Sequence, residues 1–127
     1  MIPRRKMVTI PVTRIYTGCD DRSYFEDTEV PLSEMTSLGQ LSKLISAKGV
    51  LFRQTEPGQD LDWHNAPCRQ FVVLLSGPDI EIEIGDGTVR NFAAGSVLLV
   101  EDTTGQGHIS RVTDSGEART SLFIPLT

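Results

Sequence analysis

The chain has 127 residues, which is the size of one domain with a single hydrophobic core. Lys and Arg number 12 against 17 Asp and Glu, and this net charge of −5, with no basic cluster beyond residues 4–6, disfavours a nucleic-acid partner. No apolar run in the sequence reaches the length of a membrane helix, so we expect no membrane association.

The amino terminus and the two cysteines indicate a cytoplasmic protein. Pro3 and Pro11 interrupt the basic start, and no apolar signal core follows it. Cys19 and Cys68 form no C-x-x-C pair and cannot build a disulfide framework. We therefore expect reduced thiols in a reducing compartment.

Residues 1–48 predict edge strands and a loop. Residues 8–12 and 14–16 are short extended pieces broken by Pro11, a residue tolerated at sheet edges, and such a free edge favours a homodimer. The polar stretch 17–29 is predicted to be a loop lying over the body. Apolar residues within 38–47 fit helical spacing, but the flanking glycines leave open both a short helix and a strand with a turn.

Residues 49–125 predict the core of a β barrel. Residues 80–84 alternate Ile and Glu before a Gly-Asp-Gly turn, which predicts a half-buried strand in a hairpin. The other predicted strands are 50–53, 71–75, 88–92, 97–100, 107–112 and 118–124. Short strands separated by Gly-rich turns predict an all-β fold with little helix, a sandwich or barrel, in one domain spanning residues 1–127.

The stretch 58–77 contains the residues that predict a site. His64 and Gln70 are six apart, so along an extended segment both side chains point to the same face. Asp60 and Asp62 share that parity, and a buried carboxylate needs a partner such as a metal ion or an arginine. Asp62 is therefore a candidate general base or further metal ligand, unless both aspartates lie solvated at the mouth of the barrel.

Two motifs in this region resemble those of the cupin superfamily. The first cupin motif runs G, five residues, H-x-H, three or four residues, E, six residues, G, and here those places hold Gly58, His64, Ala66, Gln70 and Gly77. The second runs G, five residues, P-x-G, two residues, H, and here, with two extra residues, those places hold Gly95, Glu101, Gly105 and His108. The resemblance implies a double-stranded β-helix, the jelly-roll barrel of cupins, with a divalent metal ion held by His64, Gln70 and His108.

The chain departs from this family pattern at two ligand positions. Ala66 stands where the family has a second histidine and Gln70 where it has a glutamate, so the implied site would hold its ion less tightly. The resemblance leaves the ion open among Fe, Mn, Ni and Zn. In another register residues 62–64 replace H-x-H and make Asp62 the first ligand, although the motif glycines then fall out of phase. Cys68 is either a soft ligand or a small buried hydrophobe.

Two classes of function remain open. In the first, the barrel is a metal-dependent enzyme of oxygenase, isomerase or lyase type that acts on a small oxygenated metabolite, and Asp62 or Glu101 moves a proton. In the second, the weakened ligand set belongs to a non-catalytic pocket, which serves as a sensor or carrier for a small ligand or metal. Loss of one histidine and the glutamate favours the second class, whereas retention of the other two histidines favours the first.

Overall fold

The computed structural model describes residues 8–112 and 116–127, and these ranges form strands without any helix. The strands are β1 (Thr9–Thr17), β2 (Ser23–Pro31), β3 (Glu34–Thr36), β4 (Gly39–Leu41), β5 (Leu51–Thr55), β6 (Leu61–His64), β7 (Gln70–Ser76), β8 (Ile80–Glu83), β9 (Val89–Phe92), β10 (Val97–Val100), β11 (His108–Val112) and β12 (Arg119–Pro125). Six strands form a sheet in the order β2-β1-β10-β7-β12-β5, and four form a second sheet in the order β6-β11-β8-β9. Strands β3 and β4 make a separate hairpin. The described ranges thus contain no helix that could cross a membrane.

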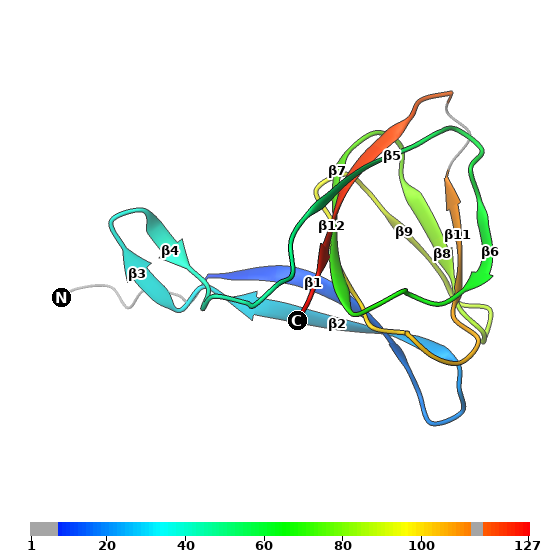
Figure 1. Cartoon of the computed structure of the whole chain (residues 1–127), viewed down its shortest axis with the longest axis horizontal. Helices are drawn as coiled ribbons and strands as arrows, with labels where there is room; N and C mark the ends of the chain where they lie inside the picture. The colour runs from blue at the N-terminus through cyan, green and yellow to red at the C-terminus, as the bar shows by residue number, and fades with distance from the viewer. Residues whose placement is uncertain (1–7, 113–115) are drawn as a thin grey trace.

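The two larger sheets face one another and enclose the core (Figure 1). Ile15, Leu74 and Leu98 come from the six-stranded sheet, while Ile82 and Phe92 come from the four-stranded sheet, and all five belong to one buried cluster. Each sheet therefore contributes one apolar face to a shared interior, which is the arrangement of a jelly-roll barrel. The prediction of an all-β fold of this type is confirmed.

The strands predicted most directly from the sequence lie in the barrel. Strand β7 lies in the interior of the six-stranded sheet, where it pairs with β10 on one side and with β12 on the other. Strands β8 and β9 form the predicted hairpin, and Ile80, Ile82 and Ile84 are buried, as the Ile/Glu alternation indicated. Period-two patterning was informative here because these strands have one face on the core.

The predicted loop at 17–29 is wrong, because most of it belongs to strand β2. Strand β2 pairs with β1 along its whole length, from Thr17↔Ser23 to Thr9↔Pro31, and only the turn between them is irregular. Its three acidic residues are exposed, while Ser23 is buried and Phe25 packs against the core. Pairing with a neighbouring strand therefore overrode the low β-propensity of the acidic residues.

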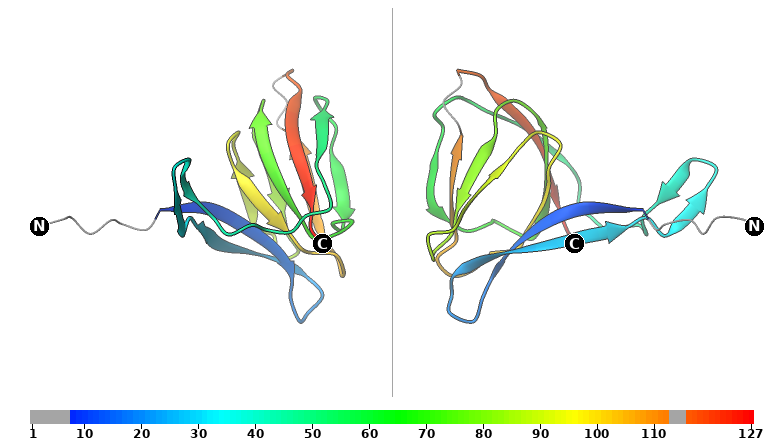
Figure 2. Two further views of the ribbon diagram at one scale, coloured as in Figure 1. Left: turned by 60° about the vertical axis from the view of Figure 1, so that its left-hand side comes forward. Right: turned by 180° about the vertical axis from the view of Figure 1, so that it is seen from behind.

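Strand β1 is an edge over only part of its length. It pairs with β10 from Thr13 to Ile15, whereas residues 9–12, which include Pro11, have only β2 beside them in the described structure. This outer part of the β1–β2 ribbon extends away from the barrel and the β3–β4 hairpin lies at its far end (Figures 1 and 2). We call residues 8–12 and 28–45 the arm.

The segment 38–47 forms a strand with a turn and not a helix. Strand β4 pairs with β3, and Gly39 follows the hairpin turn with a φ of 112°, a conformation that glycine adopts without strain. The residues after β4 are irregular up to the bridge between Ala47 and Leu126. The helical spacing of the leucines in this segment was therefore misleading.

Candidate functional site

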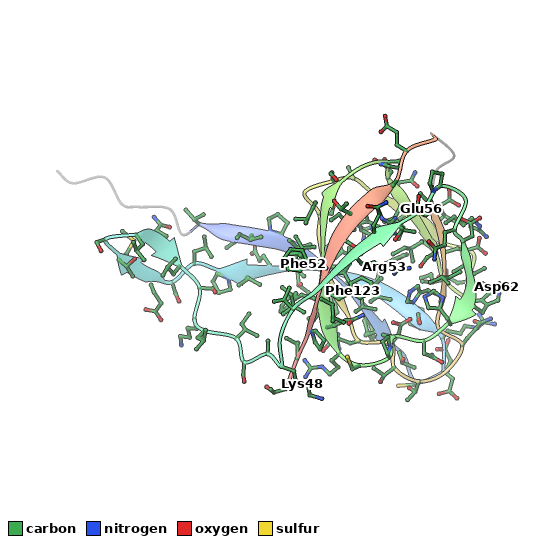
Figure 3. All side chains as sticks on the ribbon, turned by 45° about the horizontal axis from the view of Figure 1, so that its top comes forward. Lys48, Phe52, Arg53, Glu56, Asp62 and Phe123 are labelled. Atoms are coloured by element: carbon green, nitrogen blue, oxygen red, sulfur yellow. The ribbon has the colours of Figure 1, made fainter. Side chains whose placement is uncertain are left out.

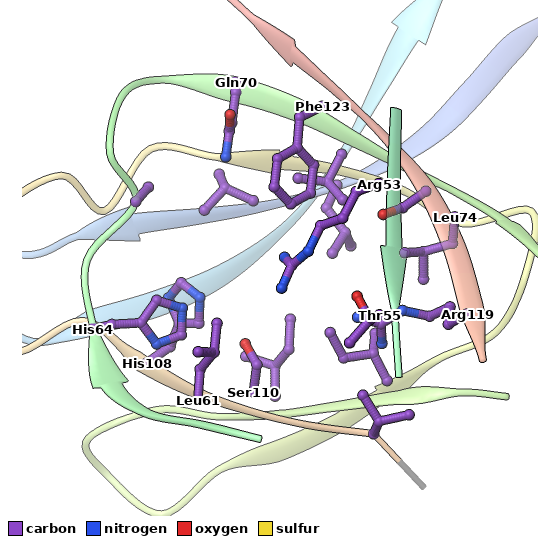
Figure 4. Close-up of a pocket in the computed structure, with 18 of the residues that line it drawn as sticks. Arg53, Thr55, Leu61, His64, Gln70, Leu74, His108, Ser110, Arg119 and Phe123 are labelled. Carbon is purple, nitrogen blue, oxygen red and sulfur yellow. The ribbon is translucent and has the colours of Figure 1, made fainter. Parts of the chain in front are cut away.

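The two histidines of the chain meet inside the barrel. His64 ends β6 and His108 begins β11, and the two residues are direct antiparallel partners. Their ring centroids lie 4.4 Å apart, with an angle of 59° between the ring planes, and both rings line a cavity (Figure 4). The convergence arises because neighbouring strands place paired side chains on the same face of the sheet.

Each imidazole uses Nδ1 to hold its orientation. Nδ1 of His64 lies 2.7 Å from the carbonyl oxygen of Asp62, and Nδ1 of His108 lies 2.6 Å from Oδ2 of Asp102. Because both oxygens accept, each Nδ1 donates the hydrogen bond, and in the neutral form of each ring the lone pair is then on Nε2. In the described structure no hydrogen bond joins either Nε2 to another residue. A neutral imidazole fixed in this way is a common metal ligand in proteins.

Asp102 is the residue that positions His108, and the sequence analysis missed it. Its side chain is fully buried, and Oδ2 also accepts a hydrogen bond of 2.7 Å from the buried hydroxyl of Ser23. Oδ1 has no hydrogen-bond partner among the described residues. In the sequence, the pair Glu101-Asp102 precedes a Gly-rich turn, so it indicated the start of that turn more readily than a carboxylate of the site. Its position six residues before His108, across the turn, is the signal that could have identified it.

The cavity between the sheets has a volume of about 150 Å³. Its apolar wall includes Val72, Leu74, Ile82, Leu98 and Val100, and its polar residues are Arg53, Thr55, Gln59, His64, Asn65, Gln70, His108, Ser110, Arg119 and Ser121. Sites for drug-sized ligands measure about 300–1,000 Å³, so this cavity fits a smaller molecule. Because polar groups from both sheets line the cavity, a polar ligand fits it.

Gln70 lies in the same cavity but not on the same strand as His64. The chain turns a corner between β6 and β7, so the two residues belong to different sheets, and their even spacing does not explain their common orientation. Gln70 is buried, and Figure 4 shows its amide on a different part of the cavity wall from the two rings. Cys68 is half-buried, with Sγ 4.0 Å from Oε1 of Gln70, and is not among the cavity-lining residues.

The expectation that Asp62 faces the interior is contradicted. Between His108↔His64 and Ser110↔Leu61, two steps along β11 correspond to three along β6, which is a β-bulge. The extra residue reverses the alternation, so Leu61 lines the cavity together with His64, while Asp62 is exposed at the outer rim (Figure 3). The carboxylate of Asp62 accepts a hydrogen bond from the backbone N–H of Trp63.

Asp60 and Glu101 also lie outside the cavity lining. Oδ1 of Asp60 accepts a hydrogen bond from the backbone N–H of Val112. Glu101 accepts hydrogen bonds from Nε of Arg14 and Nε of Arg69, both at 2.5 Å. Burial would raise the pKa of Glu101, but these two guanidinium groups outweigh it and hold the pKa below its usual range. Glu101 therefore links Arg14 on β1 to Arg69 before β7, and its carboxylate does not face the cavity in which a proton would be moved.

Arg119 is a second residue that the sequence analysis missed. It begins β12, lines the cavity, and is only 5% exposed. Burial lowers the pKa of its guanidinium, and the neighbouring charge of Arg53 lowers it further. Arg119, Ser121 and Phe123 occupy alternate positions along β12, and all three line the cavity. This alternation is the sequence signal that could have identified Arg119.

The described residues contain no group of three or more His, Cys, Asp or Glu that could hold a metal ion. The imidazole pair offers two nitrogen ligands to an ion. The side-chain amide oxygen of Gln70, a residue type not included among those four, also lines the cavity. Both Nε2 atoms suit a divalent transition metal, whereas the donor number is below the three protein ligands of typical catalytic zinc sites.

No protein-family model matches the chain, and no curated protein matches it. Among solved structures, the chain is similar to protein NMB1881 from Neisseria meningitidis, with 19% identity, a TM-score of 0.47, and 65% of this chain and 79% of that chain covered. It is also similar to a Salmonella typhimurium LT2 protein provisionally assigned as ethanolamine utilization protein Q, with 11% identity and a TM-score of 0.40 over 94% of this chain and 97% of that chain. Both likenesses are modest, and the function proposed below rests on the geometry of the cavity.

Proposed function

We propose that the protein binds a small polar metabolite inside its barrel, beside a divalent metal ion held by His64 and His108, with Gln70 as a further donor. The observation that supports this is the pair of imidazoles whose Nδ1 atoms are both occupied by oxygen acceptors and whose rings line one cavity. Such an arrangement leaves two Nε2 lone pairs for an ion.

The donor set fits a loosely held ion. Two imidazoles provide the nitrogen ligands that Fe, Mn, Ni and Zn accept, and a neutral amide is a weaker donor than the carboxylate of a typical site. Exchangeable ligands, water or an oxygen of the metabolite, would complete the shell. When bound, the ion would supply Lewis-acid polarisation of that oxygen. The chain itself contributes orientation of the metabolite and a mostly apolar wall that excludes bulk water.

A second candidate is a non-catalytic binding protein, a sensor or carrier. It is favoured because the described residues that line the cavity include no Asp or Glu, whereas an enzyme of the proposed kind commonly uses a carboxylate to move a proton. The two candidates share the same binding cavity and differ only in whether the bound metabolite is converted.

Elemental analysis after metal loading and gel filtration tests the metal site. We expect about one divalent ion per chain in the wild type and a loss of that ion in His64→Ala and in His108→Ala. Asp62→Asn is the matched control, because Asp62 is adjacent in sequence but exposed at the rim. A wild-type protein without metal, or metal unchanged in both histidine variants, would remove the proposal, and a loss in Asp62→Asn would restore the alternative register.

The same metal-loaded protein separates catalysis from binding. A panel of small diketones, hydroxy acids and sugars is tested for turnover and O₂ consumption, and in parallel for a shift in melting temperature. Turnover that requires both histidines supports the enzyme, whereas a melting shift without turnover supports the sensor or carrier.

A further inference from the structure

The end of the cavity formed by β5 and β12 contains two cations. Arg119 pairs with Thr55 across these strands, and Ser121 pairs with Arg53. All four side chains line the cavity, and no Asp or Glu is found among its described lining residues. Figure 4 shows Arg119 and Thr55 across the cavity from the two imidazoles, with the Arg53 guanidinium reaching into the space between. Among the described residues, the cavity wall therefore has two positively charged side chains and no negatively charged one.

The hydrogen-bonding groups at this end lack partners in the described structure. Nε and Nη1 of Arg119 are buried and make no hydrogen bond, and the same is true of the hydroxyl of Thr55. Neither arginine forms an ion pair with a described acid, and Cζ of Arg53 lies over the ring of Phe123, 5.2 Å from its centroid. Unsatisfied polar groups of Arg119 and Thr55 thus lie at the same end of the cavity as the Arg53 guanidinium.

Such an arrangement is costly to the folded chain alone. A buried charge loses hydration, and that loss is offset only by an opposite charge or by several hydrogen bonds. Here the nearest charged group in the cavity is another arginine, which adds repulsion. An anion bound between the two guanidinium groups would supply both the missing charge and the missing acceptors.

We infer that this end of the cavity binds the carboxylate of a small organic acid through Arg119, Arg53 and Thr55. The inference rests on the proposed function for its other half: the metabolite is an oxo or hydroxy acid whose second oxygen faces the imidazole pair. A planar carboxylate matches the donor array of a guanidinium, and the cavity of about 150 Å³ admits only a short carbon chain between the two ends.

The ligand class is tested on the full-length wild-type protein after chelator treatment, so that the metal plays no part. Pyruvate and lactate are titrated while amide chemical shifts and melting temperature are followed, and lactamide serves as the neutral molecule of the same size. We expect the two acids to bind and lactamide to bind about tenfold more weakly or not at all. Equal responses to lactate and lactamide, or a response to inorganic phosphate alone, would overturn the inference.

The residues are tested by substitution with methionine, which keeps much of the length and removes the charge. Arg119→Met and Arg53→Met should each weaken binding of the acids by about tenfold or more. Arg111→Met is the matched control, because Arg111 pairs with Glu81 and Glu83 and lies outside the cavity lining. Arg119→Met should melt at the wild-type temperature or above it, since an unpaired buried charge is removed. Unchanged acid affinity in both cavity variants contradicts the inference.

The two proposals fail separately. Acid binding that depends on Arg119, in a protein that takes up no metal, supports the carboxylate site and removes the metal site. Metal uptake that depends on both histidines, without any acid binding, does the reverse.

Discussion

At the scale of single residues, Asp102 determines how His108 is presented to the cavity. The buried carboxylate accepts the Nδ1 proton of His108 and is itself held by Ser23. A carboxylate in this position fixes the tautomer and makes Nε2 a better donor, in the way that outer-shell acids support metal-bound histidines. His64 has only a backbone carbonyl in the same role, so its orientation depends on the conformation of β6.

We predict that Asp102→Asn weakens metal binding without unfolding the protein. The neutral amide still accepts a hydrogen bond but no longer raises the basicity of the ring, and comparable changes lower affinity by about 10–100-fold. Competition with a chromogenic chelator measures the affinity, and circular dichroism checks the fold. Asp27→Asn, which removes an exposed carboxylate paired with Arg90, should leave the affinity unchanged. Equal affinities of Asp102→Asn and wild type would contradict a supporting role for Asp102.

Glu101 gives a pH-dependent prediction. Its pKa is lower in the folded protein than in the unfolded chain, so its contribution to stability is present above the unfolded pKa of about 4.3 and is lost as the pH falls through the folded pKa. Glu101→Gln should therefore reduce the free energy of unfolding by roughly 1 kcal/mol at pH 7 and by much less near pH 3. Urea unfolding of both proteins at the two pH values measures the difference. A difference that is as large at the acidic pH would show that the ion pairs with Arg14 and Arg69 are not its source.

At the scale of elements, the close pairing of β6 with the segment before β11 creates the site. Gly107 has a φ of 77°, and a Cβ there would overlap the carbonyl oxygen of His64. Only glycine lets the two backbones approach closely enough for His64 and His108 to pair. The strand pairing and the imidazole pair therefore depend on the same residue.

We predict that Gly107→Ala is much more disruptive than Gly87→Ala. Both glycines have a positive φ, so each substitution costs roughly 1–3 kcal/mol in backbone strain, but Gly87 has open space around it and Gly107 does not. The displaced β6 in Gly107→Ala should also abolish metal uptake, while Gly87→Ala should retain it. Thermal unfolding and elemental analysis of both variants provide the measurement, and equal destabilisation would argue against the close approach.

The elements also show why part of the site could be predicted from the sequence and part could not. The spacing of the motif residues predicted that His64 and His108 belong to one site. The two residues do lie on neighbouring strands of the same sheet. The bulge in β6 has no composition signal, so strict alternation misplaced Asp62. Arg119 was missed because a charged residue in a strand is expected to face solvent, and only the paired strands show that its side chain is enclosed.

At the scale of the whole molecule, the barrel could be predicted, whereas of the arm only the edge strand at residues 8–12 could be. Apolar strands between Gly-rich turns imply two sheets packed on one another, whatever their connections. The arm gives no such signal, because β2 is rich in acidic residues and extends beyond the core that defines the other strands. Isolated two-stranded ribbons are marginally stable in water, so the arm needs a surface to pack against.

That surface, we predict, belongs to a second copy of the chain. The arm leaves Leu38 85% and Leu44 99% exposed, and residues 9–12 of β1 have a strand on one side only within the described structure. Exposed apolar side chains beside a free sheet edge are features that subunit interfaces cover, and symmetric dimers are the commonest way to cover them. Light scattering coupled to gel filtration should therefore give twice the chain mass of 14.0 kDa at micromolar concentration.

Substitutions in the arm test whether it forms the interface. Ile10→Glu and Leu38→Glu place a charge on the proposed contact, so they should shift the protein towards the monomer and lower its melting temperature through loss of the partner. Val89→Glu introduces the same charge at an exposed apolar position on β9, in the other sheet, and should leave the dimer intact. A wild-type monomer would exclude the dimer, and a dimer that survives both arm substitutions but not Val89→Glu would place the interface on the four-stranded sheet. Because the histidines and arginines of the cavity lie outside the arm, the monomeric variants should still bind metal and small acids, which would separate assembly from the chemistry of the site.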